Sequence, residues 1–185
     1  MKDLGSKVLK TERLTLRPFK KEDAEEMYQN WAHDFEVTKY LTWTPHESVE
    51  VTRAYCAQME EQAKNPEVYH WAIVYGGELI GDITINHAPL SETGIIGYCM
   101  AKKFWGKGLM TEALQEVLRY AFEEVGFHRI EGTHAKQNIG SSRVMEKCGL
   151  LYEGTKRDGF RLRSTGEWVD IVVRGILKED YLSRK

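Results

Sequence analysis

Cysteine is scarce in this chain, with three among 185 residues. Cys56, Cys99 and Cys148 lie far apart, form no CxxC pair and are odd in number. That spacing argues against a disulfide framework and against a zinc site. We therefore expect small buried thiols and no bound metal.

Long apolar runs are also missing, and neither sign of charge dominates. No stretch approaches the roughly 18 apolar residues that cross a bilayer, and the first residues, MKDLGSKVLKTERL, lack the apolar centre of a signal peptide. The 26 Lys and Arg face 28 Asp and Glu, a formal net charge of −2. Such a balance excludes whole-protein attraction to nucleic acid or to an anionic membrane. The expected protein is cytoplasmic, with no nucleic-acid or membrane partner.

The composition is that of an ordinary folded protein. Apolar residues make up 42% and charged residues 29%, which is typical of globular proteins. A chain of this length can bury a core without disulfide or metal cross-links. We expect one domain that spans residues 1–185.

Hydrophobic periodicity changes several times along the chain, from two residues in some segments to three or four in others. Alternation between a strand period and a helix period indicates an α/β (α+β) fold with a sheet of mixed strand direction. The expected elements are a strand at 13–19, helices at 20–31 and 48–64, strands at 69–75, 78–87 and 94–101, a helix from Gly108 to Gly126, a strand at 129–135, a helix at 138–149, and strands at 150–160 and 166–177.

A glycine-bearing turn, KKFWGKG at 102–108, stands between a predicted strand and the clearest helix. Backbone N–H groups at a helix start have no intrahelical acceptors, and the helix dipole adds positive potential there. Gly106 and Gly108 carry no side chains that would block close approach, while Lys102, Lys103 and Lys107 add positive charge. The turn is therefore predicted to bind phosphate, against the purely structural alternative of a turn with solvated lysines.

Two common phosphate ligands fit this turn poorly. A P-loop needs four residues between its glycines and a Lys-Ser/Thr after the second, and neither feature is present. A dinucleotide fingerprint needs a third glycine or alanine where Thr111 stands. The pattern therefore favours neither ATP nor NAD.

The turn resembles the Arg/Gln-x-x-Gly-x-Gly/Ala signature of the GCN5-related N-acetyltransferase (GNAT) family, with Lys103 in place of the usual Arg or Gln. The blocks TERLTLRPFKKEDAEEMY, GIIGYCMAKKFWGKGLMTEAL and NIGSSRVMEKCGLLYEGTKRDGF follow the order and spacing of a subgroup, the ribosomal-protein N-terminal (alanine/serine) acetyltransferases. The resemblance covers nearly the whole chain. It implies a single domain with a mixed, mostly antiparallel sheet of six to seven strands, about four flanking helices, and a V-shaped splay between strands 94–101 and 129–135.

The resemblance also implies acetyl-CoA as the co-substrate, with its pyrophosphate in the turn and its pantetheine arm in the splay. A backbone N–H near Cys99 or Met100 would stabilise the oxyanion. Asn138 would bind the pantetheine amide, or alternatively only cap its helix. The residues expected to contact acetyl-CoA are Cys99, Met100, Lys103, Phe104, Trp105, Gly106, Lys107, Gly108, Leu109, Met110, Thr111, Asn138 and Ser141.

Proton transfer is where this sequence departs from the family. Acetyl transfer from a thioester needs a neutral amine and a proton for the leaving thiolate. The tyrosine that many members use as the acid is replaced by Met145, so the resemblance assigns the thiol proton to Ser141.

The two carboxylates that the subgroup offers as the base are replaced by Ile95 and Phe160. His134 and Asp158 are the base candidates we favour. Asp82 and His87 on a neighbouring strand remain alternatives.

The acceptor is less determined than the cofactor. Trp43 and His46 are predicted walls of its cleft. An α-amine with a pKa of about 7.8 is roughly a tenth neutral at pH 7, whereas a lysine amine is neutral at about four parts in ten thousand, so weak base assistance favours a protein or peptide N-terminus.

Two further functions stay open alongside N-terminal acetylation. One is acetylation of a small amine such as a polyamine or aminoglycoside, and the other is a non-catalytic acyl-CoA sensor. The family's frequent dimers imply a homodimer.

Overall fold

A computed structural model describes residues 1–88 and 92–184. Its centre is one eight-stranded sheet in the order β1-β2-β3-β4-β5-β6-β8-β7. Neighbouring strands are antiparallel except β5 and β6, which are parallel. The strands are β1 (Leu9–Lys10), β2 (Leu14–Arg17), β3 (Tyr69–Tyr75), β4 (Glu78–Ala88), β5 (Thr93–Met100), β6 (Arg129–Ala135), β7 (Leu151–Arg161) and β8 (Trp168–Leu177).

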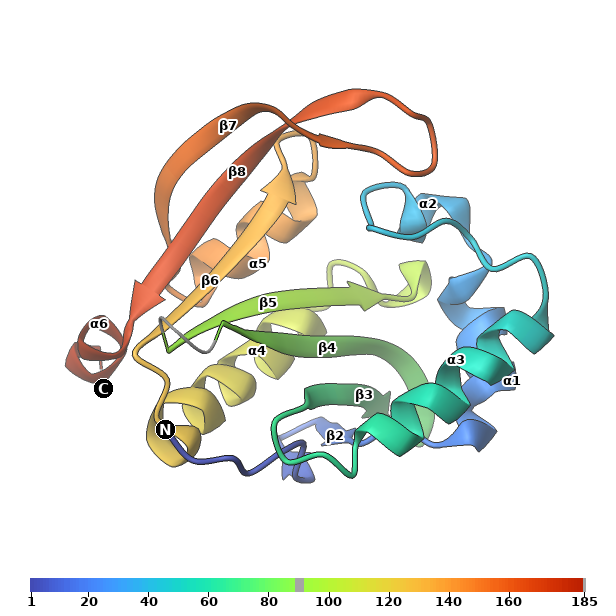
Figure 1. The fold of residues 1–185 in the computed structure, drawn as a ribbon, viewed down its shortest axis with the longest axis horizontal. Helices are drawn as coiled ribbons and strands as arrows, with labels where there is room; N and C mark the ends of the chain where they lie inside the picture. The colour runs from blue at the N-terminus through green and yellow to red at the C-terminus, as the bar shows by residue number, and fades with distance from the viewer. Residues whose placement is uncertain (89–91, 185) are drawn as a thin grey trace.

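Helices cover both faces of this sheet (Figure 1). α4 lies behind the sheet, α5 lies behind β6, and α1 and α3 lie on the face opposite α4. The helices are α1 (Ala24–Met27), α2 (Phe35–Thr38), α3 (Val49–Gln62), α4 (Leu109–Arg119), α5 (Ile139–Lys147) and α6 (Lys178–Ser183), with 3-10 turns η1 (Lys21–Asp23) and η4 (Lys102–Phe104) and π-helical turns η2 (Tyr28–Ala32) and η5 (Tyr120–Val125).

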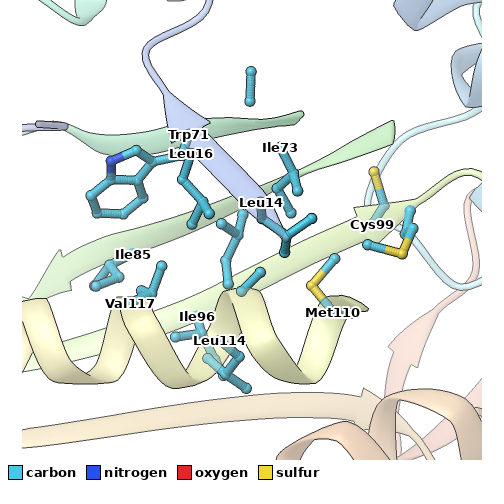
Figure 2. Close-up of a cluster of buried hydrophobic side chains, with 14 of the residues drawn as sticks. Leu14, Leu16, Trp71, Ile73, Ile85, Ile96, Cys99, Met110, Leu114 and Val117 are labelled. Atoms are coloured by element: carbon cyan, nitrogen blue, oxygen red, sulfur yellow. The ribbon is translucent and has the colours of Figure 1, made fainter. Parts of the chain in front are cut away.

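The apolar stripe of α4 explains why this helix packs where it does. Leu114 and Val117 are completely buried against the sheet, and Figure 2 shows Leu114 beside Ile96 of β5 and Val117 beside Ile85 of β4. Complete burial of such a side chain stabilises the fold by about 1.5–3 kcal/mol. The helical segment continues through η5 and ends at Gly126 in a left-handed conformation (φ 92°), as its glycine predicts.

The predicted V-shaped splay is present between β5 and β6. These strands pair only over Thr93–Ile96 and Arg129–Gly132, and the rest of each strand diverges (Figure 1). Half of β5 therefore has no strand on that side, and the opening faces the turn before α4.

The structure confirms the expected α/β class, with corrections of detail. The sheet has eight strands instead of six to seven, because the two-residue β1 is too short to leave a periodic pattern. The helix expected at 20–31 is divided into η1, α1 and η2, and the described residues form six α-helices where four were expected. α2 and α6, with four and six residues, were not predicted. Part of the loop expected before Gly94 lies outside the described residues.

Candidate active site

A cleft of about 660 Å³ opens at the splayed ends of β5 and β6. Its walls come from four places far apart in the sequence: α2 with the segment that follows it, the end of β5, the glycine turn with the start of α4, and α5 with the residues just before it. The described residues that line it include Glu36, Val37, Lys39, Tyr40, Leu41, Tyr98, Cys99, Met100, Phe104, Trp105, Gly106, Gly108, Leu109, Met110, Thr111, Asn138, Ser141, Arg143 and Lys147.

The end of β5 presents free backbone groups to this cleft. The Ala101 N–H donates to the Ile80 carbonyl at 2.8 Å, and bonded pairs alternate along an antiparallel ladder, so Cys99 bonds back to β4. The backbone N–H and C=O groups of Tyr98 and Met100 then point the other way, into the splay. The Met100 carbonyl accepts from Trp105 Nε1 at 2.6 Å, and the Met100 N–H faces the splay, whereas the Cys99 N–H belongs to the ladder with β4.

The glycine turn has the geometry of an anion site. Gly106 and Gly108 have φ values of 74° and 76°, which only glycine adopts without strain. Gly108 is the N-cap of α4, and the first helical bond runs from the Glu112 N–H to the Gly108 carbonyl at 3.0 Å. The N–H groups of the first turn therefore have no intrahelical acceptors and face the cleft.

The three lysines of the turn lie elsewhere than predicted. Lys103 pairs with Glu78 and donates to Asn30 Oδ1 at 3.1 Å. Lys102 lies 4.0 Å from Glu36 Oε2, and Lys107 lies over the Phe104 ring at 5.1 Å. None of the three is among the residues that line the cleft.

Cations that the sequence reasoning missed come instead from α5. Arg143 and Lys147 are exposed on this helix and line the cleft near the start of α4. Their spacing of four residues puts them on one helical face. That spacing, directly after the Asn138 cap, was the available sequence signal.

Asn138 and Ser141 both line the cleft. Asn138 caps α5, because its Oδ1 accepts from the Ser141 N–H at 3.1 Å. The Ser141 hydroxyl lies 2.9 Å from the Tyr98 hydroxyl, a partner that the sequence reasoning did not identify. Burial raises the pKa of Tyr98, which keeps this group protonated. Met145 is buried in the core, 2% exposed, so α5 offers no tyrosine there.

His134 and Asp158 are not brought to the cleft. His134 is 7% exposed, its Nδ1 lies 2.9 Å from the Ala135 carbonyl, and burial lowers its pKa. Asp158 lies on the exposed part of β7, and its N–H donates to Asp170. Neither residue lines the cleft.

The predicted acceptor walls are also displaced. Trp43 packs against the core, and His46 Nδ1 contacts the Thr52 hydroxyl at 2.7 Å. Tyr40, which lines the cleft, and Phe160 of β7 pack against the same small apolar cluster, and the Ser164 hydroxyl donates to the Lys39 carbonyl at 3.0 Å. The segment after α2 and the β7–β8 hairpin therefore meet beside the cleft.

The comparison with known families decides the identity of this arrangement. The model of the acetyltransferase (GNAT) domain matches residues 13–151. The chain belongs to the GNAT acetyltransferase family. This GNAT protein is accordingly an acyltransferase, and the part of the chain that the structure describes holds no cluster of His, Cys, Asp and Glu that could bind a metal ion.

Relatives of similar length support the assignment. The probable N-acetyltransferase YjcK of Bacillus subtilis is 34% identical over 180 residues, which cover 94% of this chain and 98% of YjcK. A GNAT-family acetyltransferase structure from Bacillus anthracis is 31% identical, with a TM-score of 0.81 over 94% of this chain and 99% of that one.

A third match shows the related fold with coenzyme A. The structure of Mycobacterium smegmatis RimJ in complex with CoA-disulfide is 26% identical, with a TM-score of 0.78 over 90% of this chain and 83% of that chain.

Among the described residues, no helix is long and apolar enough to cross a bilayer.

Proposed function

We propose that this chain transfers the acetyl group of acetyl-CoA to the α-amine of a protein or peptide. One observation carries the proposal: the free N–H groups at the start of α4 and the unpaired N–H of Met100 open onto the same cleft. A pyrophosphate bound at the first site would extend its pantetheine arm along β5 toward the second. Arg143 and Lys147 would pair with phosphate oxygens.

The chemistry then uses groups of this chain in two roles. The Met100 N–H stabilises the carbonyl oxygen of the thioester as it gains charge. The Ser141 hydroxyl gives its proton to the departing sulfur, and Tyr98, one hydrogen bond away, holds Ser141 in position. Asn138, whose Oδ1 is occupied by the cap, keeps its amide N–H groups for the pantetheine.

The α-amine is the acceptor that these surroundings favour. Ile95 and Phe160 stand where the subgroup has carboxylates, and Phe160 packs in a small apolar cluster. An α-amine is neutral far more often than a lysine side chain at pH 7. A curated relative, the ribosomal protein uS5-alanine N-acetyltransferase of Escherichia coli, is 33% identical over 86 residues, 46% of this chain and 43% of its own length.

A small-molecule amine is the second candidate. FsC-acetyl coenzyme A-N(2)-transacetylase of Aspergillus fumigatus is 30% identical over 156 residues, which cover 80% of this chain and 66% of that protein. The contact between the segment after α2 and the β7–β8 hairpin narrows the acceptor side, and a slender acceptor of either class would fit there.

The acceptor class can be tested by free-thiol release from acetyl-CoA. The acceptors are peptides with free Ala or Ser N-termini, the same peptides with a blocked N-terminus and one lysine, spermidine, and an aminoglycoside. We expect kcat/KM for free N-termini to exceed that for the blocked lysine peptide by about 10²-fold at pH 7. Faster turnover of lysine or spermidine would contradict the proposal, and mass spectrometry of the product locates the acetyl group.

A further inference from the structure

A polar cluster that the mechanism above leaves unused lies directly behind the β5 wall of the cleft. Asp82 of β4 stands opposite Cys99 of β5 in the ladder. Cys99 Sγ donates to Asp82 Oδ1 at 2.8 Å, and His70 Nε2 lies 2.9 Å from Oδ2. Three adjacent strands therefore bring a thiol, a carboxylate and an imidazole into one hydrogen-bonded row.

This row faces α3, on the side of the sheet opposite α4. Ile83 and Ile85 alternate with Asp82 along β4, and Ile85 points toward α4 (Figure 2). On the other side, His70 Nδ1 lies 3.2 Å from Met59 Sδ of α3. The side chains of His70 and Asp82 are only 13% and 16% exposed.

Three neighbours of Asp82 are weak acids whose burial disfavours their charged forms. Burial raises the pKa of Cys99 well above its ordinary value, and burial also raises the pKa of Tyr55 of α3. Cys56, on the same helix, has a pKa raised to about 12 by burial. These groups stay protonated at neutral pH, and His70 is the side chain that contacts the other oxygen of the carboxylate. Buried ion pairs add little net stability, so stability alone does not explain the cluster.

Cys99 connects the cluster to the cleft. Of the two residues that bond to the Asp82 carboxylate, Cys99 lines the cleft and His70 does not. The next residue is Met100, whose N–H faces the splay. Asp82 is thus one hydrogen bond behind the site of acyl transfer, whereas His134 and Asp158 lie away from the cleft.

We propose that Asp82 is the proton acceptor of the reaction, reached through the Cys99 thiol and oriented by His70. The inference rests on the proposed acetyl transfer. An N–H bond of the substrate ammonium breaks, its proton goes to Cys99 Sγ, and the thiol proton passes to Asp82 Oδ1. The neutral amine then forms the C–N bond and the C–S bond breaks. Ser141 protonates the sulfur and recovers a proton from the nitrogen, so one proton per turnover remains on Asp82 and later passes to water.

Glu36 is the rival for this role. It is the carboxylate among the described residues that lines the cleft directly. Its side chain is 57% exposed and lies 4.0 Å from Lys102. An exposed, solvated carboxylate can attract a cationic acceptor, but its hydrogen bonds do not connect it to β5.

The test compares pH profiles of kcat/KM for the amine acceptor that the wild-type protein uses best. Asp82→Asn keeps the shape of the side chain and removes its basicity. We expect about a 10²-fold loss at pH 7, with recovery toward wild type above about pH 9, where an α-amine is already neutral. Cys99→Ser should stay within a few-fold of wild type because a hydroxyl can relay a proton, whereas Cys99→Ala should behave like Asp82→Asn.

His70 is a positioning residue, and its variants have their own expectations. His70→Gln keeps a donor for Oδ2 and should retain most activity, while His70→Leu should lower kcat/KM mainly at low pH. His87→Gln is the matched control on β4, because His87 packs against Phe127 beyond the cleft. Thermal unfolding and acetyl-CoA affinity, measured for each variant, separate a loss of fold from a loss of chemistry.

Each outcome decides the proposal. An Asp82→Asn loss that is equal at every pH, or the pH signature in Glu36→Gln instead, would overturn the role of Asp82. Full activity of Cys99→Ala would overturn the thiol route. The acceptor class is determined from the wild-type rates on the acceptor panel, and the base is determined from the ratio of variant to wild-type kcat/KM. If a small amine were the preferred acceptor, the N-terminal proposal would be wrong. The role of Asp82 could still be tested with that amine as the acceptor.

Discussion

Ser141 makes two separate hydrogen bonds, one through its backbone and one through its side chain. Its backbone N–H completes the Asn138 cap, and its hydroxyl meets Tyr98 at 2.9 Å inside the cleft. The cap needs only the backbone of Ser141, so the hydroxyl is available for chemistry. The two roles can be separated by removing the hydroxyl alone.

Ser141→Ala is expected to lower kcat by about 10²-fold, the usual size of a proton-transfer contribution. Its acetyl-CoA affinity should change little, because the start of α4 and the α5 cations remain. Steady-state kinetics with calorimetric CoA binding measure both quantities. Ser142→Ala is the control, since the Ser142 hydroxyl bonds to Glu146 and Arg174 and not to the cleft. An unchanged kcat in Ser141→Ala would remove this hydroxyl from the mechanism.

For single residues, the sequence predicts backbone conformations and helix caps better than it predicts where long side chains point. The Asn138 cap and the two glycine conformations follow from local rules. The direction of Lys103 does not, because it depends on Glu78, which β-strand pairing brings close. Tyr98 was missed for the same reason, since its partner is 43 residues away.

Among the elements, α4 depends most on a single backbone conformation. Gly108 begins this helix with φ 76° and stands where free N–H groups face the cleft. A Cβ there would meet only Arg13 at 3.7 Å, so strain and not collision opposes a side chain.

Gly108→Ala should destabilise the fold by about 1–2 kcal/mol and weaken acetyl-CoA binding more than tenfold, because the turn relaxes away from the phosphate-binding geometry. Gly154→Ala is the control, with open space around it and no positive φ. Chemical denaturation and CoA titration report the two effects. Wild-type affinity in Gly108→Ala would show that the N–H groups at α4 do not hold the cofactor.

The elements with long periodic patterns are the ones that sequence reasoning predicts well. β3 and β6 have the predicted bounds, and α4 follows its apolar stripe. The four-residue α2 has no room for such a pattern, although it carries part of the cleft wall. The splay came from the family resemblance, because no local rule says where two parallel strands separate.

For the whole molecule, two histidines contribute to the response to acid, and of these His134 is buried and His46 is half-buried. Burial lowers the pKa of both His134 and His46. The unfolded chain takes up protons at these positions near pH 6.5 and the folded chain resists them. The stability that these two rings contribute is therefore fully present above pH 6.5 and falls as the pH drops through that value.

His134→Gln should reduce the loss of unfolding free energy between pH 7.5 and 5.5. This expectation holds whether or not the substitution changes the stability at pH 7.5. Urea unfolding at several pH values gives the slope of the unfolding free energy against pH. His128→Gln, at an exposed position, should keep the wild-type slope. A steeper slope in His134→Gln would mean that protonation of this ring stabilises the fold.

The early separation of β5 and β6 places two edge strands inside the protein. Edges with free N–H and C=O groups are sites where another chain can add itself and begin aggregation. The cofactor, lying along β5, would act as a temporary ninth strand. A GNAT protein kept in excess coenzyme A should therefore be protected in storage as well as in catalysis, by the mass action of a ligand that binds only the folded chain.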